Sequence, residues 1–270
     1  MSDHTAAATP GFLITKEYRR FAEFCDACRR YRYIGVCYGA PGVGKTLSAR
    51  RYARWDVRAP SLTSPVSPPC PPAEMGASPT LLYTPPVANS PSQIYREVAY
   101  LQCALGWGGE DAGPAPDAGA AACPTDDDTE LIVVDEADRL NMLGLEQLRD
   151  IYDRGQMGLV FIGMPGLDKR LARYPQLYSR VGFVHHFRAL GAEEMRFILR
   201  HKWKQLGLTL LADDLTDAEA IAAVTRITGG NFRLLQRLFT QIERILQINH
   251  LRTVTKDVVD AAREGLVIGP

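Results

Sequence analysis

The 270-residue chain lacks the features that mark membrane and exported proteins. No apolar run approaches the roughly 20 residues of a membrane-spanning helix. The start, MSDHTAAATPGF, has no basic segment followed by an apolar core, so no signal peptide is predicted. Cys25 and Cys28 form a lone C-x-x-C motif with no second pair at metal-ligand spacing. We therefore expect a cytoplasmic protein in a reducing compartment, with these two thiols buried as small apolar residues.

Two segments are poor in residues that could build a core. Residues 58–79 are crowded with proline, which neither helices nor strands tolerate, so an exposed loop is expected there. Residues 106–130 contain seven acidic residues and no lysine or arginine, and we expect an acidic surface insert at 106–129. Without those seven, the chain has 31 basic and 24 acidic residues, although its formal net charge is zero. A basic body is compatible with a polyanionic partner.

A phosphate-binding loop is predicted at GAPGVGKT, residues 39–46. The apolar run YIGVCY precedes it and a helical pattern follows it, which is the context typical of a P-loop. Lys45 is expected to reach the β- and γ-phosphates of ATP, and the Thr46 hydroxyl to ligate Mg²⁺. Glycines in such a loop let the backbone N–H groups face phosphate. The predicted nucleotide contacts are Gly39, Ala40, Pro41, Gly42, Val43, Gly44, Lys45, Thr46 and Leu47.

A second motif, ELIVVDEADRL, fits the other half of an ATP site. The apolar residues 131–134 run into Asp135 and Glu136, which is the Walker B pattern. Asp135 is expected to hold Mg²⁺, and Glu136 to orient and deprotonate the attacking water. Two acidic residues at the end of a strand would not by themselves indicate a function. Because a P-loop precedes them in the sequence, they predict Mg²⁺-dependent ATP hydrolysis. The letters DEAD at 135–138 also occur in helicases, whose second motor domain would not fit this length.

The element pattern predicts an α/β fold. Five strand candidates alternate with helices, which favours a five-stranded parallel sheet with helices on both faces. We expect an N-terminal helical segment at 1–32, a nucleotide-binding domain at 33–190 and a lid of four helices at 191–270. Within the nucleotide-binding domain, the run LDKRLARYPQLYSRV (167–181) is predicted as one helix.

The order of these motifs, followed by YSRV and GGNFR, resembles the AAA+ ATPases over nearly the whole chain. The resemblance implies that Arg180 is an arginine finger reaching a neighbouring subunit's nucleotide, and hence a homo-oligomer, either ring or filament. It also implies that Arg233 is the sensor-2 arginine, which touches the γ-phosphate from the lid. The family normally presents a polar residue at the end of the fourth strand. Met164 occupies that position here, so either another side chain substitutes for the polar residue or hydrolysis is slow, and we expect a slow ATPase.

Within that family, VDEADRL, TGGNFRLLQRL and the compact lid are similar to the transposition target-selection ATPases, the group of Mu B, TnsC and TniB. The resemblance implies double-stranded DNA and a transposase as partners. Candidate DNA contacts are Arg96, Lys16, Arg19 and Arg20. Two alternatives stay open. One is a nucleotide switch that gates a protein partner in signalling, defence or secretion. The other is a replication loader, against which the lack of a collar or winged-helix domain argues.

Overall fold

The computed structural model describes residues 12–56, 80–106, 129–205 and 215–266. The proline-rich segment and nearly all of the acidic insert lie outside the described residues. The chain divides into two compact units. In their described parts, the first comprises residues 18–39 and 45–187, and the second comprises residues 12–17, 40–44 and 188–266.

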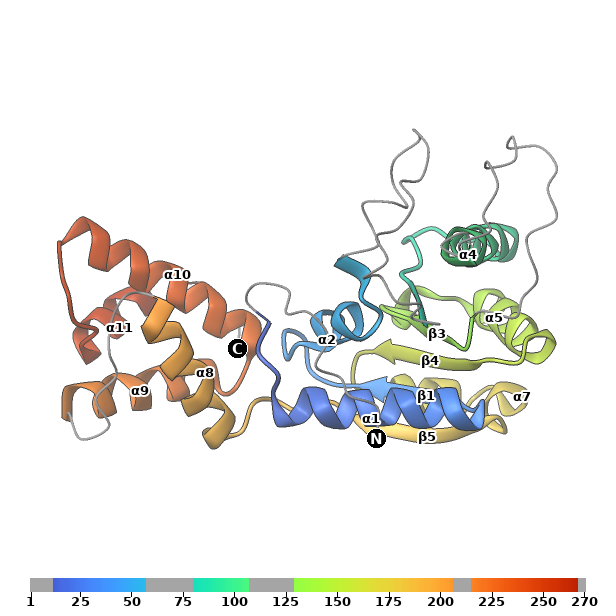
Figure 1. The fold of residues 1–270 in the computed structure, drawn as a ribbon, viewed down its shortest axis with the longest axis horizontal. Coiled ribbons are helices and arrows are strands. Elements are labelled where there is room, and N and C mark those ends of the chain that lie inside the picture. Colours follow the sequence, from blue (N-terminus) through green and yellow to red (C-terminus); the bar gives the residue numbers. More distant parts are fainter. Residues whose placement is uncertain (1–11, 57–79, 107–128, 206–214, 267–270) are drawn as a thin grey trace. The chain divides into compact units, whose positions relative to one another are not determined.

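The first unit is built on the five-stranded parallel sheet that the sequence predicts (Figure 1). Its strand order is β2-β3-β4-β1-β5, and every neighbouring pair is parallel. β1 lies between β4 and β5, and β3 lies between β2 and β4. The strands are β1 (Ile34–Tyr38), β2 (Thr80–Tyr83), β3 (Leu131–Val134), β4 (Gly158–Gly163) and β5 (Val181–His186).

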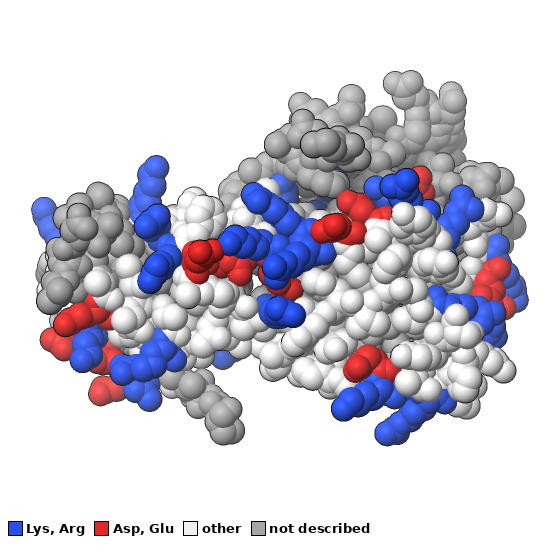
Figure 2. Space-filling view, turned by 90° about the horizontal axis from the view of Figure 1, so that it is seen from below, with Lys and Arg blue, Asp and Glu red and all other residues white. Residues whose placement is uncertain are grey.

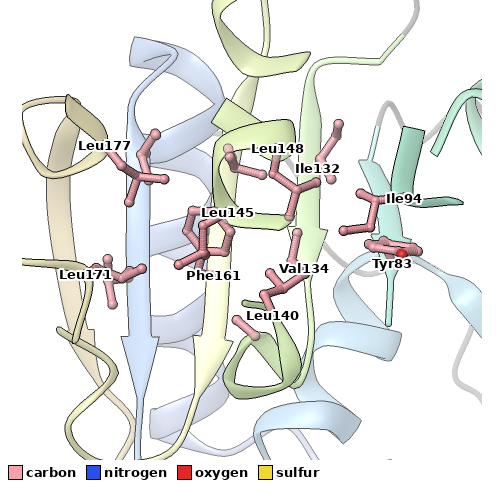
Figure 3. Close-up of a cluster of buried hydrophobic side chains, with 14 of the residues drawn as sticks. Tyr83, Ile94, Ile132, Val134, Leu140, Leu145, Leu148, Phe161, Leu171 and Leu177 are labelled. Atoms are coloured by element: carbon pink, nitrogen blue, oxygen red, sulfur yellow. The ribbon is translucent and has the colours of Figure 1, made fainter. Parts of the chain in front are cut away.

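Helices cover both faces of this sheet. The side chains of β1 alternate, so that Ile34 and Val36 join the core cluster of one face, together with residues of α4, α5, α6 and α7. Leu145 and Leu148 of α5 lie against the strands in that cluster (Figure 3). The helices around the sheet are α1 (Lys16–Tyr31), α2 (Lys45–Tyr52), α4 (Pro91–Gly106), the short 3-10 helix η2 (Ala137–Arg139), α5 (Met142–Arg154), α6 (Leu167–Leu171) and α7 (Pro175–Tyr178).

The opposite face of β1 carries α1. A Cβ atom on Gly35 would lie 2.7 Å from the Phe24 ring and would overlap the Cys28 sulfur, so the helix approaches the strand closely. Cys25 and Cys28 are both fully buried, which confirms their predicted role as small core residues. Burial raises the pKa of the Cys28 thiol to about 12, so the group stays neutral.

One predicted element is wrong. The run 167–181 forms two short helices, α6 and α7, instead of a single helix. Pro175 is the first residue of α7, where its missing N–H costs nothing. The same residue would break a helix that ran through it, and it forces Tyr174 out of the helical region (φ −115°, ψ 85°).

The second unit contains the four predicted helices, and among them Trp203 of α8 packs edge-on against Phe239 of α10, with ring centroids 5.3 Å apart. Asn231 caps α10, because its side chain accepts a hydrogen bond from the Leu234 N–H. The helices are α8 (Ala192–Gln205), α9 (Leu215–Thr228), α10 (Phe232–Ile248) and α11 (Lys256–Glu264). No helix in the described part of the chain is both long and apolar enough to cross a membrane.

The contact between α1 and β1 predicts a cost for any side chain at position 35. Gly35→Ala should lower the free energy of unfolding by about 1–3 kcal/mol, because the added methyl group overpacks the interface. Gly191→Ala is the matched control, since its new Cβ would meet its nearest neighbour at 3.7 Å. Urea unfolding followed by circular dichroism measures both. A Gly35→Ala protein as stable as the control would contradict the tight packing.

Candidate nucleotide site

The predicted P-loop connects the end of β1 to the start of α2. Gly42 and Gly44 have φ values of +80° and +111°, which only glycine adopts at low cost. Lys45 is the first residue of α2, and its Nζ donates a hydrogen bond to the Gly39 carbonyl oxygen at 2.6 Å. The loop therefore has the turning backbone that phosphate binding requires, with its lysine folded over it.

Asp135 and Thr46 meet beside this loop, as a Mg²⁺ site requires. Asp135 directly follows β3 and is 4% exposed, and its carboxylate is hydrogen-bonded to the Thr46 hydroxyl. Burial raises the pKa of Asp135, while Thr46 and the charge of Lys45 act in the opposite direction. Mg²⁺ prefers hard oxygen ligands and keeps several waters, so a hydroxyl and a carboxylate side by side fit this ion. Its charge would also stabilise the carboxylate that burial disfavours.

Glu136 stands next to that pair but is held by a different residue. Its backbone is left-handed (φ 52°, ψ 43°), and its carboxylate forms an ion pair with the Arg139 guanidinium. Arg139 also donates from Nη1 to the Pro85 carbonyl oxygen at 3.0 Å. We did not predict a role for Arg139, although residues three apart are neighbours on a helical turn.

Met164 follows β4 directly, as expected, and its side chain is 41% exposed. Its backbone N–H donates to Asp138 Oδ2 at 2.7 Å. A Cβ atom on Gly163 would lie 2.5 Å from the same oxygen, so the Asp138 carboxylate lies closely against the end of β4. The polar group at this strand end therefore comes from the segment after β3, because a thioether is only a weak acceptor.

Arg180 lies at the other end of the sheet. It directly precedes β5, and its carbonyl oxygen accepts from the N–H of Ile34, the first residue of β1. The P-loop leaves the far end of β1, about 17 Å away for five residues at roughly 3.3 Å each. Two nitrogens of Arg180 donate to the two carboxylate oxygens of Asp153, at 2.6 and 2.9 Å. Arg180 is therefore out of reach of the P-loop of its own chain.

Arg233 belongs to the second unit, as does the central part of the P-loop. Its backbone N–H donates to the Gly42 carbonyl oxygen at 3.0 Å, while its side chain is exposed. The Asn231 side chain donates to the Pro41 carbonyl oxygen at 2.9 Å. We did not predict this contact from the sequence, because it joins residues 190 positions apart.

A cavity of about 430 Å³ opens beside Thr46 and Asp135. Its walls come from the ends of α2 and β2 and from α4, and they combine aromatic and proline side chains with two arginines. Glu136 is not among the described residues that line it. Those residues are Thr46, Arg50, Trp55, Leu82, Tyr83, Thr84, Pro85, Pro86, Glu97, Tyr100, Leu101, Asp135 and Arg139.

The candidate DNA contacts do not form one patch. Arg19 and Arg20 are exposed on α1, whereas Arg96 is exposed on α4, which covers the opposite face of the sheet. Lys16 forms an ion pair with Glu193 at 2.6 Å, so its charge is partly compensated. Acidic side chains lie among the basic ones on the face shown in Figure 2.

Comparison with known proteins agrees with this geometry. Residues 28–171 match a family described as AAA domain. This chain belongs to the AAA domain family. A Staphylococcus aureus protein described as a potential ATP-binding protein is 43% identical to this AAA chain over 270 residues, which is 96% of this chain and 97% of that relative. The chain is thus an ATP-binding NTPase of the AAA type.

Solved structures show the same fold at low sequence identity. The RuvB Holliday junction branch migration motor of Thermotoga maritima is 15% identical with a TM-score of 0.60. The match covers 97% of the present chain and 73% of the RuvB chain. The ORC2 protein of Aeropyrum pernix, in ADPNP–ADP complexes, is 16% identical with a TM-score of 0.59. The match covers 97% of the present chain and 70% of the ORC2 chain.

The site predicts that two substitutions separate binding from turnover. Lys45→Ala should abolish ATP binding, because it removes the charge that opposes the β- and γ-phosphates. Glu136→Gln should bind ATP normally and lose turnover by about 10²-fold or more, because it keeps the phosphate and Mg²⁺ contacts but removes the base. Binding of a fluorescent ATP analogue and release of phosphate measure the two effects. Equal loss of binding in both variants would refute this division of roles.

Proposed function

We propose that this AAA protein is an ATPase that oligomerises on duplex DNA in its ATP-bound state and presents target DNA to a transposase. The observation that carries the proposal is the pair of hydrogen bonds from Arg233 and Asn231 to the carbonyl oxygens of Gly42 and Pro41. They join the phosphate-binding loop to α10, so a nucleotide that shifts the loop also shifts the helical unit. A ligand that prefers one of two such states acts as a switch.

Hydrolysis in this proposal uses residues at the carboxyl ends of β1 and β3. Thr46 and Asp135 would hold Mg²⁺, which neutralises charge on the phosphates when bound. Lys45 binds the phosphates, and Glu136 accepts a proton from the attacking water. Because Met164 offers no polar side chain to position that water, turnover is slow, which suits a switch better than a motor.

Assembly in this proposal depends on Arg180. It lies at the amino ends of the strands, opposite the P-loop of its own chain, and in this proposal it serves the nucleotide of a neighbouring subunit. The Asp153 carboxylate holds its guanidinium at the surface, with the arginine side chain 33% exposed. The transposase as final partner rests on the resemblance of VDEADRL and TGGNFRLLQRL to the target-selection group.

An arginine that works in trans allows complementation between two inactive proteins. Neither Arg180→Ala nor Glu136→Gln alone should turn over ATP at an appreciable rate, because an arginine finger contributes on the order of 10³-fold or more and a general base about 10²-fold or more. An equimolar mixture should recover a fraction of wild-type turnover, since Glu136→Gln still binds ATP and therefore assembles, and some interfaces pair its intact finger with an intact P-loop and base. Arg154→Ala, which removes another exposed arginine paired on α5, is the control and should keep full activity alone. Mixed oligomers without any turnover would show that Arg180 is not the finger.

A basic stripe on α8 adds a surface for DNA phosphates. Arg196, Arg200 and Lys204 are all exposed, and their spacing of four places them on one side of the helix. The fold shared with a Holliday junction branch migration motor supports DNA as the partner. Contacts to phosphates carry no sequence information, so binding is nearly sequence-independent and falls steeply with salt.

A titration of labelled duplexes tests the proposed function. With a non-hydrolysable ATP analogue, affinity should be high for unrelated sequences and should fall strongly between two salt concentrations. With ADP or no nucleotide it should be weak. Arg200→Ala should reduce the slope of log affinity against log salt by about one, the loss of one phosphate contact, whereas Arg154→Ala should not change it. Two outcomes would reject target selection in favour of a switch that acts on a protein partner. One is DNA affinity that is the same with the ATP analogue, with ADP and without nucleotide, and the other is no DNA binding even at low salt.

A further inference from the structure

The ion pair between Glu136 and Arg139 concerns the residue on which hydrolysis depends. A general base must have a free carboxylate oxygen within hydrogen-bond reach of the water it deprotonates. In this structure a guanidinium contacts that carboxylate. The contact engages Oε2, which is one of the two oxygens from which the base could accept the proton of water.

Arg139 is fixed on its other side as well. Its Nη1 donates to the Pro85 carbonyl oxygen, two residues beyond β2, and its own carbonyl oxygen accepts from the Asn89 side chain at 3.2 Å. Asn89 also donates to the Pro86 carbonyl oxygen at 2.9 Å. The guanidinium thus links the chain leaving β2 to the carboxylate that follows β3.

The cavity next to the proposed Mg²⁺ ligands is lined, in the described part of the chain, by Arg139 but not by its partner Glu136. Thr46, Asp135, Arg139 and Pro85 line it, and among the described residues Glu136 does not. Arg139 therefore forms part of the wall beside the proposed Mg²⁺ ligands, whereas Glu136 is not among the described lining residues. The Glu136 side chain itself is 47% exposed, so it has room to turn once the ion pair opens.

We propose that Arg139 is a positioning residue that restrains Glu136, so that opening their ion pair increases ATP turnover. This inference rests on the proposed hydrolytic role of Glu136. The Arg139 contact to Pro85 makes the end of β2, in the wall of the cavity, the place from which the restraint is released. The ion pair is then a second cause of slow ATP turnover, in addition to the lack of a polar side chain at Met164.

Steady-state hydrolysis by the full-length protein tests the restraint. Arg139→Ala should raise kcat by about three- to tenfold, well within the roughly 10²- to 10⁴-fold that a general base supplies, while KM and ATP-analogue affinity stay unchanged. Arg139→Lys should give a smaller rise, because a lysine keeps one charge but cannot span both partners. Arg154→Ala, which also loses an exposed ion pair, should match the wild type.

A double variant shows whether the effect passes through the base. Glu136→Gln with Arg139→Ala should be no faster than Glu136→Gln alone, since no carboxylate remains to be released. A rise that survives in the double variant would overturn the restraint, as would wild-type or lower kcat in both Arg139 variants at unchanged ATP affinity. Absence of turnover in the wild type and in Arg139→Ala would overturn the ATPase activity and the restraint together, whereas failure of the restraint alone leaves wild-type turnover intact.

Discussion

Parallel strand pairing determines where the candidate ATP-site residues of the first unit lie. Because all five strands run in one direction, the segments that follow β1, β3 and β4 arrive at the same edge of the sheet. That edge brings Thr46 to Asp135 and places Asp138 against Met164. The same parallel arrangement sends Arg180, which precedes a strand, to the opposite edge. The parallel topology therefore gathers the candidate ATP-site residues that follow β1 and β3 at one edge of the sheet and separates Arg180 from them.

The groups proposed to act on ATP are all engaged within the single chain. Lys45 donates to Gly39, Glu136 is paired with Arg139, and Arg180 is paired with Asp153. Ion pairs at a protein surface contribute about 0–1 kcal/mol each. A ligand bound with micromolar affinity provides about 8 kcal/mol. Opening these contacts is thus a small cost compared with the free energy of nucleotide binding, so they do not prevent these side chains from turning to a bound ligand.

The sequence predicted the sheet because its signals are local. Short apolar runs bounded by glycine, proline or acidic residues gave all five strands, and the P-loop and Walker B motifs placed their functional residues at strand ends. The helix predicted across 167–181 was wrong because the apolar spacing outweighed Pro175, which ends one helix and starts another. The partners of Arg180 and of Met164 could not be predicted. Asp153 and Asp138 lie 27 and 26 residues away in the sequence, so the contacts depend on the tertiary fold and leave no local signal.

The bonds between the P-loop and α10 use a different part of the loop from the one that binds phosphate. Arg233 and Asn231 donate to carbonyl oxygens, whereas a phosphate accepts from N–H groups, so the two sets of contacts can exist at the same time. Gly42 permits both. Its positive φ turns the loop, and a Cβ atom there would lie 2.5 Å from the Asn231 oxygen. Phosphate binding by the N–H groups of the loop is therefore compatible with the contacts that its carbonyl oxygens make to α10.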